Sequence, residues 1–343
     1  MISNQDLDYY QIVFPKMGID INIKSEAFTV FGVQIQWYGV IITIGMLLAI
    51  LFGFSQMKKY GIDSDRAIDA IIGGIIGGVI GARLYYVFLE WDSYKGNLKE
   101  IINTRNGGLA IYGGIIGAVL IGGLIAKIRK LRLMPLLDIA GMGFLIGQGI
   151  GRWGNFFNHE AFGYNTDLPW GMTSGKIQEW IIENNSAMSS TADILAMDPM
   201  KPVHPCFLYE SIWCLLGFVV LFLISKRRKF DGQMFLMYVG WYGIGRFFIE
   251  GMRTDSLMLG NLRVSQVLGM IAFISSVIII FIMGSKVKRM GSEYVFYRDS
   301  DESKNLIEET LKKMNKSKKS EKLSSVITKD ESKKDENPNS EDS

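Results

Sequence analysis

The chain has 343 residues, 48% of them hydrophobic, and a formal net charge of only +3. So small a charge gives no reason to expect a nucleic-acid partner. Residues 285–343 are almost entirely polar, so the preceding residues must be strongly apolar, as in membrane proteins.

Seven apolar runs are long enough to cross about 30 Å of hydrocarbon, which takes roughly 20 helical residues. In chain order they lie at about Trp37–Met57, Ala67–Leu89, Gly108–Ala126, Leu133–Gly151, Cys206–Ser225, Gly232–Glu250 and Val264–Gly284. The sequence therefore predicts an all-α integral membrane protein with seven transmembrane helices.

Basic residues follow every odd-numbered span, and lysine and arginine favour the cytoplasmic side of short loops. They are Lys58, Lys59 and Arg66, then Lys127, Arg129, Lys130 and Arg132, then Lys226, Arg227, Arg228 and Lys229, and finally Lys286, Lys288 and Arg289. We therefore expect the N-terminus outside and the C-terminus in the cytoplasm.

Three polar regions flank or interrupt the predicted membrane body at 37–284. Residues 1–36 form an expected extracytoplasmic arm, and residues 163–203 an extracytoplasmic head loop. Residues 285–343 mix lysine, acidic residues and serine, which predicts a disordered cytoplasmic tail with at most a transient helix at Asn305–Met314.

The cysteines and glycines favour packing over chemistry. Cys206 and Cys214 are eight residues apart on one predicted helix, or about 12 Å, which is too far for a disulfide, and neither has a metal-ligand pattern. Glycines at four-residue spacing in the second, third and fourth spans allow close helix packing in lipid. No metal site is expected.

Polar side chains gather where six of the predicted helices reach the outer surface. One alone is an ordinary interfacial residue, but their common depth is more typical of a site. Arg246 and Glu250 share a helix face and can pair. With Arg152, Arg246 makes a doubly cationic site suited to a phosphate group, which predicts a phospholipid ligand. The set is Tyr38, Arg83, Glu90, Tyr112, Arg152, Asn155, His204, Tyr209, Glu210, Arg246, Glu250 and Arg253.

The most specific stretch is GRWGNFFNHEAFG at Gly151–Gly163. Supporting motifs are WYG at Trp37–Gly39, GARLYY at Gly81–Tyr86, GGLAIYGG at Gly107–Gly114, HPCFLYE at His204–Glu210 and YGIGRFFIEGMR at Tyr242–Arg253. With these six ordered motifs, the chain resembles the prolipoprotein diacylglyceryl transferase family over nearly all of its membrane body.

The resemblance implies transfer of a diacylglyceryl group from phosphatidylglycerol to the thiol of a lipobox cysteine in a preprolipoprotein signal peptide. A thioether forms and glycerol phosphate leaves, with no cofactor. Preorganised positive charge is the expected main contribution to such a phosphate displacement. The implied location is the bacterial plasma membrane.

Carried over by motif, Arg152 and Arg246 resemble a phosphate clamp, and Glu250 and Arg253 resemble groups that orient Arg246 and close the pocket. Gly163 resembles a backbone requirement. The remaining residues resemble the polar wall, substrate contacts or border of the pocket, and they are Tyr38, Arg83, Asn155, Asn158, Glu160, His204 and Glu210.

Two positions depart from the family pattern. Tyr112 stands where many members have a histidine regarded as a candidate base, and tyrosine titrates near 10, so it needs a lowered pKa to act as one. His204, Glu160 or no dedicated base remain alternatives, since a thiol with a pKa near 8.5 is partly ionised at neutral pH. The second departure is His159, where a small residue is common.

Two other classes of function fit parts of the pattern. An anionic lipid or solute transporter or flippase predicts inner-leaflet polar groups and repeat symmetry, which are not visible. A noncatalytic seven-helix receptor or assembly factor gives no reason for arginines, amides and carboxylates to meet at one depth. The transferase interpretation accounts both for the lack of visible inner-leaflet polar groups and for the arginines, amides and carboxylates at one depth.

Overall fold

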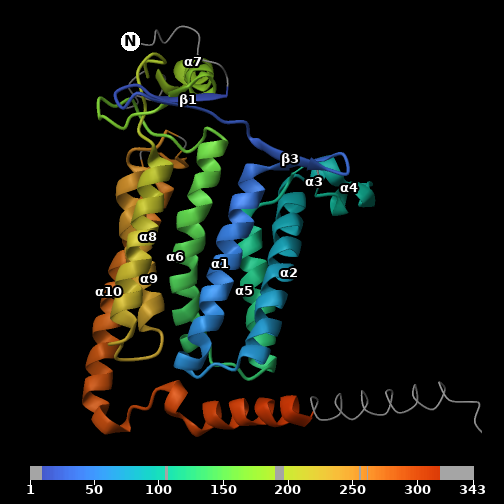
Figure 1. Ribbon diagram of the computed structural model, residues 1–343, viewed down its shortest axis with the longest axis vertical. Coiled ribbons are helices and arrows are strands. Elements are labelled where there is room, and N and C mark those ends of the chain that lie inside the picture. The colour runs from blue at the N-terminus through green and yellow to red at the C-terminus, as the bar shows by residue number, and fades with distance from the viewer. Residues whose placement is uncertain (1–9, 105–106, 190–196, 255, 261, 317–343) are drawn as a thin grey trace, which may run out of the picture. The chain divides into compact units, whose positions relative to one another are not determined.

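The computed structural model describes residues 10–104, 107–189, 197–254, 256–260 and 262–316, and it is mostly helical. The chain divides into two compact units (Figure 1). Unit 1 takes residues 1–56 and 137–294, and unit 2 takes residues 57–136 and 295–343. The two units are described separately below.

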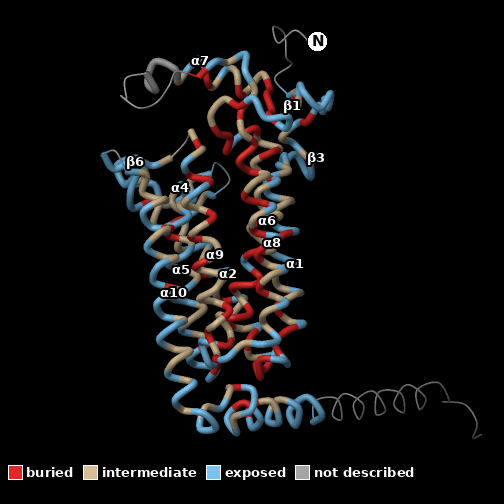
Figure 2. Tube along the Cα trace, turned by 90° about the vertical axis from the view of Figure 1, so that its left-hand side faces the viewer, coloured by how far each residue is buried: buried red, intermediate tan, exposed pale blue. Residues whose placement is uncertain are grey.

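Long apolar helices form most of unit 1. These are most of α1 (Trp37–Tyr60) and α6 (Leu133–Phe157), followed by α8 (Cys206–Ser225), α9 (Gln233–Glu250) and α10 (Val264–Met290). Buried positions are frequent along α6, whereas α10 is mainly exposed (Figure 2). An exposed apolar helix surface is what a protein surrounded by lipid tails requires.

A reciprocal tryptophan pair joins α8 to α9. The rings of Trp213 and Trp241 stack with centroids 4.6 Å apart, and each indole N–H donates to the other residue's carbonyl at 2.9 Å. Gly217 and Gly245 face these rings, and a Cβ at either glycine would overlap an indole nitrogen. The pair therefore satisfies two partly buried polar groups and sets how closely the helices approach.

Short strands and one helix form a small polar subdomain in unit 1. β1 (Gln11–Phe14) lies between β2 (Ile19–Asn22) and β5 (Thr173–Ser174), antiparallel to both, and α7 (Gly175–Ser189) follows β5. Two hairpins lie elsewhere in the unit, β3 (Glu26–Val30) with β4 (Val33–Gln36) and β6 (Met258–Leu259) with β7 (Leu262–Arg263). The subdomain core contains Ile12, Ile23, Phe156, Phe162, Met172, Ile177, Ile181, Met197, Val203 and Phe207.

Unit 2 is built on the pairing of α2 (Ser64–Leu89) with α5 (Ile111–Ile128). Gly77 and Gly81 of α2 lie against the backbone of Gly113 and Gly117 of α5, where no Cβ would fit. The predicted role of these glycines in close packing is therefore confirmed. Two short helices, α3 (Trp91–Tyr94) and α4 (Leu98–Ile102), connect the pair.

The polar region after α10 contains more structure than the sequence predicts. A 3₁₀ turn, η1 (Gly291–Glu293), follows α10, then η2 (Tyr297–Asp299) and a helix over residues 301–316. Within unit 2, Tyr297, Ser303 and Leu306 are buried, and the Ser303 hydroxyl donates to the Gly61 carbonyl at 2.6 Å. The predicted disorder is therefore wrong for residues 291–316, because a few apolar side chains there pack against other residues and become buried. Residues 317–343 of the predicted tail lie outside the described residues.

Six helices of the described residues are long and apolar enough to cross a membrane: α1, α2, α5, α6, α8 and the helix that begins at Val264. The predicted span Gly232–Glu250 coincides with α9, which is not one of the six because Gln233, Arg246 and Glu250 lower its hydropathy. The protein is therefore a mostly helical, multi-pass membrane protein, and the count of seven spans stays a prediction.

Candidate functional site

Three helices of unit 1 bring charged side chains together. Arg152 lies in the last turns of α6, and Glu210 lies in the second turn of α8. Arg246 and Glu250 lie in the last turns of α9, and Arg253 follows that helix by three residues. The C-terminal ends of α6 and α9 thus meet the N-terminal end of α8, although these residues are far apart in sequence.

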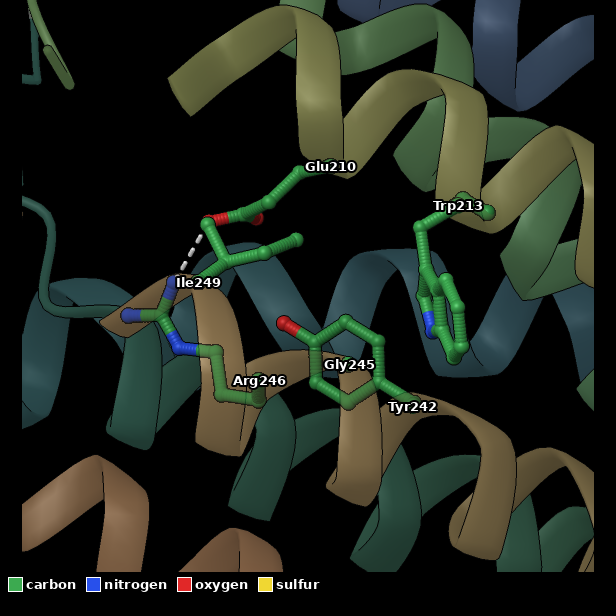
Figure 3. Close-up of a pocket in the computed structure, with 7 residues that line it drawn as sticks. Glu210, Trp213, Tyr242, Gly245, Arg246 and Ile249 are labelled. Carbon is green, nitrogen blue, oxygen red and sulfur yellow. Dashed lines mark hydrogen bonds and ion pairs between the residues drawn. The ribbon is translucent and has the colours of Figure 1, made fainter. Parts of the chain in front are cut away.

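Glu210 is the centre of this cluster. It accepts from Arg246 Nη1 at 2.7 Å (Figure 3) and from Arg253 Nη1 at 3.2 Å, and it forms an ion pair with Arg152 Nη2. Only 4% of its surface is exposed. A buried carboxylate is retained only when it is paired and hydrogen-bonded, and here three guanidinium groups meet that requirement.

Glu250 holds Arg246 from a second side. Its Oε2 lies 2.7 Å from Arg246 Nη2, so the pairing predicted from the four-residue spacing is present. The Glu250 backbone carbonyl accepts from Arg263, whose Nη2 also donates to the Tyr164 hydroxyl at 3.1 Å. The last turn of α9 is therefore tied to Arg263, the residue that immediately precedes α10.

The cations of the cluster are more accessible than the anions. The side chains of Arg152 and Arg246 are 22% and 20% exposed, whereas those of Glu210 and Glu250 are 4% and 2% exposed. Buried carboxylates thus fix one edge of each guanidinium group and leave another edge within reach of a ligand. Three arginines against two carboxylates keep a positive excess, which suits an anion.

A small cavity lies between α8 and α9 beside this cluster (Figure 3). Its volume is about 10 Å³, roughly the space of one water molecule. It is lined by Glu210, Trp213, Cys214, Tyr242, Gly245, Arg246 and Ile249. The cavity is too small for an organic substrate, so a ligand would have to meet the exposed edges of the arginines.

Amide side chains extend the site beyond α6. Asn155 Nδ2 donates to Glu160 Oε1 at 2.9 Å, and Asn158 Nδ2 donates to the same oxygen at 3.3 Å. Asn155 Oδ1 in turn lies 3.4 Å from Arg152 Nη1. Glu160 is exposed, so its carboxylate is oriented by the two amides but remains accessible to solvent.

His159 points away from this polar set. Its side chain is buried, with Nδ1 at 3.0 Å from Ser174 Oγ and Nε2 at 3.4 Å from the Ile23 carbonyl. Burial lowers the pKa of this imidazole below its usual value. His159 and Ala161 both have positive φ, at 54° and 57°, so the loop around Glu160 is held in a backbone conformation that L residues rarely adopt. His159 therefore has a structural environment, and the direct role raised by its departure from the family pattern has no contact to support it.

Glycine is required on steric grounds at two positions of the signature, the Gly151–Gly163 stretch. A Cβ at Gly163 would lie 2.5 Å from the Met252 carbonyl oxygen and 2.8 Å from Cys206 Sγ, and Gly163 forms an antiparallel bridge with Arg253. A Cβ at Gly154 would lie 2.7 Å from the ring of Tyr38, which is 39% exposed. Both glycines allow site residues from distant segments to pack against α6 and its loop.

His204 belongs to a short hydrogen-bond chain with Tyr209 and Trp170. The Trp170 indole N–H donates to the Tyr209 hydroxyl at 2.7 Å, and that hydroxyl lies 3.1 Å from His204 Nδ1. A hydroxyl that accepts from the indole can still either donate to Nδ1 or accept from it, so this contact fits both neutral tautomers of the imidazole. Burial lowers the pKa of His204. Nδ1 is engaged by the Tyr209 hydroxyl, and His204 stays a candidate base.

Arg83 and Tyr112 belong to unit 2 and are described within it. Tyr112 is the second residue of α5, and its side chain is 58% exposed. Arg83 is only 6% exposed, and its guanidinium donates to backbone carbonyls of unit 2. These contacts do not support the predicted substrate contact of Arg83.

Two site residues were not predicted from the sequence. Arg263 supports Glu250, but it precedes an apolar span and so resembles an ordinary interfacial arginine. Tyr242 lines the small cavity within a mostly apolar helix, where an aromatic residue is normally a packing residue. Only the position of Tyr242 one turn before Arg246 indicates that it faces the charged cluster.

The apolar helices define a multi-pass membrane protein, and its partly exposed arginine cluster has the charge that suits an anion. Comparison with known proteins is more specific. The sequence profile of the family "Prolipoprotein diacylglyceryl transferase" matches residues 25–282, and the chain belongs to that family.

Similar proteins named phosphatidylglycerol–prolipoprotein diacylglyceryl transferase occur in several bacteria. The one from Clostridioides difficile (strain 630) is 42% identical over 267 residues, covering 78% of this chain and 98% of the relative. The one from Finegoldia magna is 43% identical over 254 residues, covering 74% and 93%, and the one from Listeria innocua is 42% identical over 255 residues, covering 74% and 88%. Family membership thus extends over the whole helical body and not over the signature alone.

Proposed function

We propose that this protein transfers the diacylglyceryl group of phosphatidylglycerol to the cysteine thiol of a lipobox in a preprolipoprotein signal peptide, releasing glycerol phosphate. The observation that carries the proposal is the Glu210-centred arginine cluster in a chain of this family. The names of these relatives favour a transferase over the transporter considered from the sequence.

The proposed chemistry needs stabilisation of a phosphate leaving group. The thiolate attacks the glyceryl carbon, a C–S bond forms as the C–O bond to phosphate breaks, and the electron pair passes to the phosphate oxygen. The exposed edges of Arg152 and Arg246 face the charge that develops there, and Glu210 and Glu250 keep the two arginines in place. The thiol proton passes to Tyr112, His204 or Glu160, or to solvent without a dedicated base.

The proposal extends to topology. Seven spans, with α9 as one of them, place the ends of α6, α8 and α9 that carry the cluster in the outer leaflet, with the N-terminus outside and the C-terminus in the cytoplasm. The β1–β2–β5 sheet and α7 then form an extracytoplasmic head that helps admit the peptide. The basic residues after α1, α5 and α8 support this orientation.

The direct test is mass spectrometry of a lipobox peptide incubated with the purified protein and phosphatidylglycerol. A diacylglyceryl mass on this peptide, and none on a peptide with serine in place of the cysteine, is expected. Arg152→Ala and Arg246→Ala should each lower the rate by about 10²–10³-fold, the usual cost of a lost charge-stabilising donor. Full activity in both variants would refute the clamp, and no adduct with folded wild-type protein would refute the transferase.

A further inference from the structure

Arg83 of unit 2 is a buried cation whose role the proposed chemistry does not explain. Nε donates to the Ile101 carbonyl at 2.8 Å and Nη2 to the Glu100 carbonyl at 2.5 Å. Nη1 donates to the carbonyls of Gly107 at 3.1 Å and Gly108 at 2.8 Å. Four backbone carbonyls from two segments therefore converge on one guanidinium group, which offers only five N–H donors.

Aromatic rings complete the environment of this guanidinium. Its central carbon lies 4.9 Å from the ring centroid of Tyr94 and 6.0 Å from that of Tyr86. Such positions over aromatic rings stabilise a cation that has left water. Since Arg83 is 6% exposed and its donors are engaged by the chain itself, it has little left to offer a phosphate group.

The two segments that Arg83 holds both lie within the connection from α2 to α5. Glu100 and Ile101 are at the end of α4, where carbonyls lack helical partners. Gly107 and Gly108 follow with φ of +84° and +76°. A Cβ at Gly108 would overlap Arg83 Nη1 and lie 2.9 Å from the Tyr86 ring, whereas a Cβ at Gly107 would meet nothing within 4 Å.

The Gly107–Gly108 segment leads directly into the first turn of α5. The Ala110 amide donates to the carbonyl of Ala82, the neighbour of Arg83, at 3.0 Å. α5 begins at Ile111, and Tyr112 is its second residue. The position of the Tyr112 backbone is therefore set by consecutive α2 residues through one backbone and several side-chain hydrogen bonds.

We infer that Arg83 is a positioning residue for the transferase reaction, which sets the start of α5 and hence Tyr112 by gathering four backbone carbonyls, and that it does not bind the lipid. This inference rests on the proposed function for its consequence in catalysis. Its structural part stands on the contacts of unit 2 alone. Lysine cannot replace the arginine, because a single ammonium group cannot reach four carbonyls in two directions.

The test combines Arg83→Lys with transferase kinetics and with amide hydrogen exchange in the full-length protein. We expect kcat to fall roughly 10- to 100-fold, the scale of a misplaced reacting group, while KM for phosphatidylglycerol changes by less than about threefold. We also expect faster exchange at residues 107–113. The control Arg129→Lys, which alters a half-exposed arginine of unit 2 paired with Asp69, should change neither.

A matched glycine pair covers the case in which Arg83→Lys does not fold. Gly107→Ala and Gly108→Ala impose similar backbone strain, but only the second displaces the guanidinium. Gly108→Ala should reproduce the kcat loss and the faster exchange, and Gly107→Ala should show a smaller change in both.

Three outcomes would overturn the inference: a rise in KM with unchanged kcat, exchange at residues 107–113 that stays at the wild-type rate in Arg83→Lys, or equal effects of the two glycine substitutions. An inactive wild-type protein would instead overturn the proposed function. The exchange measurement would still decide whether Arg83 holds the segment.

Discussion

At the scale of single residues, Glu210 is the most consequential side chain of the site. Removing its charge by Glu210→Gln leaves three arginines that face one another without their shared partner. Because breaking a buried ion pair on one side is costly, we expect the free energy of unfolding to fall by about 3–5 kcal/mol. Thermal denaturation in detergent measures the change.

Glu160→Gln is the matched control, since Glu160 is exposed and accepts only from two amides. Its effect on stability should stay within about 0.5 kcal/mol. Equal stability of the two variants would contradict the central role of Glu210 in the cluster.

The two histidines predict how stability depends on pH. The chain has only His159 and His204, and burial lowers the pKa of both. Above a pH of about 6.5 both imidazoles are neutral in the folded and in the unfolded chain, so they do not lower the free energy of unfolding. As the pH falls below about 6.5, the unfolded chain takes up protons first, and stability decreases until the folded-state pKa values are passed.

Melting temperatures measured between pH 7.5 and pH 5.5 test this dependence. His159→Asn should reduce the slope of melting temperature against pH, whatever it does to stability at pH 7.5. A slope identical to that of the wild-type protein would show that His159 does not titrate in this range.

Residue spacing predicts some of these contacts and not others. The pair Arg246 and Glu250 follows from four residues on one helix, and its ion pair is present. The partners of Glu210 come from α6 and α9, and no local spacing encodes which helices meet. For Arg83 the sequence predicts a substrate contact that the structure does not support. An arginine near the end of an apolar span suggests a binding site, but the partners of Arg83 are backbone carbonyls, which a sequence pattern does not reveal.

At the scale of elements, the tryptophan pair makes a prediction about how α8 meets α9. Gly217→Ala places a methyl group against the Trp241 indole nitrogen, so the stacked rings must separate. We expect a loss of about 1–3 kcal/mol in the free energy of unfolding, the usual cost of overpacking. Thermal denaturation in detergent detects a loss of this size.

The control is Gly284→Ala in α10, where a Cβ would meet nothing within 4 Å. This variant should be as stable as the wild-type protein or slightly more stable, because alanine favours helix. If Gly217→Ala were equally harmless, the reciprocal pair would not govern the approach of α8 and α9.

The sequence predicts the type of element correctly where apolar runs are long. It does not predict the short strands. Six predicted spans coincide with described helices that can cross a membrane. The strands β1, β2 and β5 have two to four residues each, too few for an alternating pattern, and the pairing of β1 with β5 joins residues far apart in the chain.

At the scale of the whole molecule, the region after α10 divides into two parts with different expected effects. Deleting residues 317–343 leaves every described contact in place, so the melting temperature should stay unchanged. Deleting residues 291–343 also removes Tyr297 and Leu306, two buried apolar side chains. Each contributes about 1.5–3 kcal/mol when fully buried, so a clearly lower melting temperature is expected.

Neither deletion should abolish transfer to the lipobox peptide, because the family match ends at residue 282. Loss of activity in a folded deletion variant would assign a catalytic part to the tail. The sequence could not predict that residues 295–306 pack within unit 2, because the composition of this region is that of a disordered chain and only three of these side chains are buried.

The pairing of β1 with β5 has a consequence for how the chain is made. Ile12 pairs with Ser174, so the first strand waits for its partner while the intervening helices emerge. At roughly 5–20 residues per second, that wait lasts on the order of ten to thirty seconds during synthesis. Over this period the N-terminal segment must stay unaggregated beside the insertion machinery, and the subdomain core closes only after several helices have entered the bilayer.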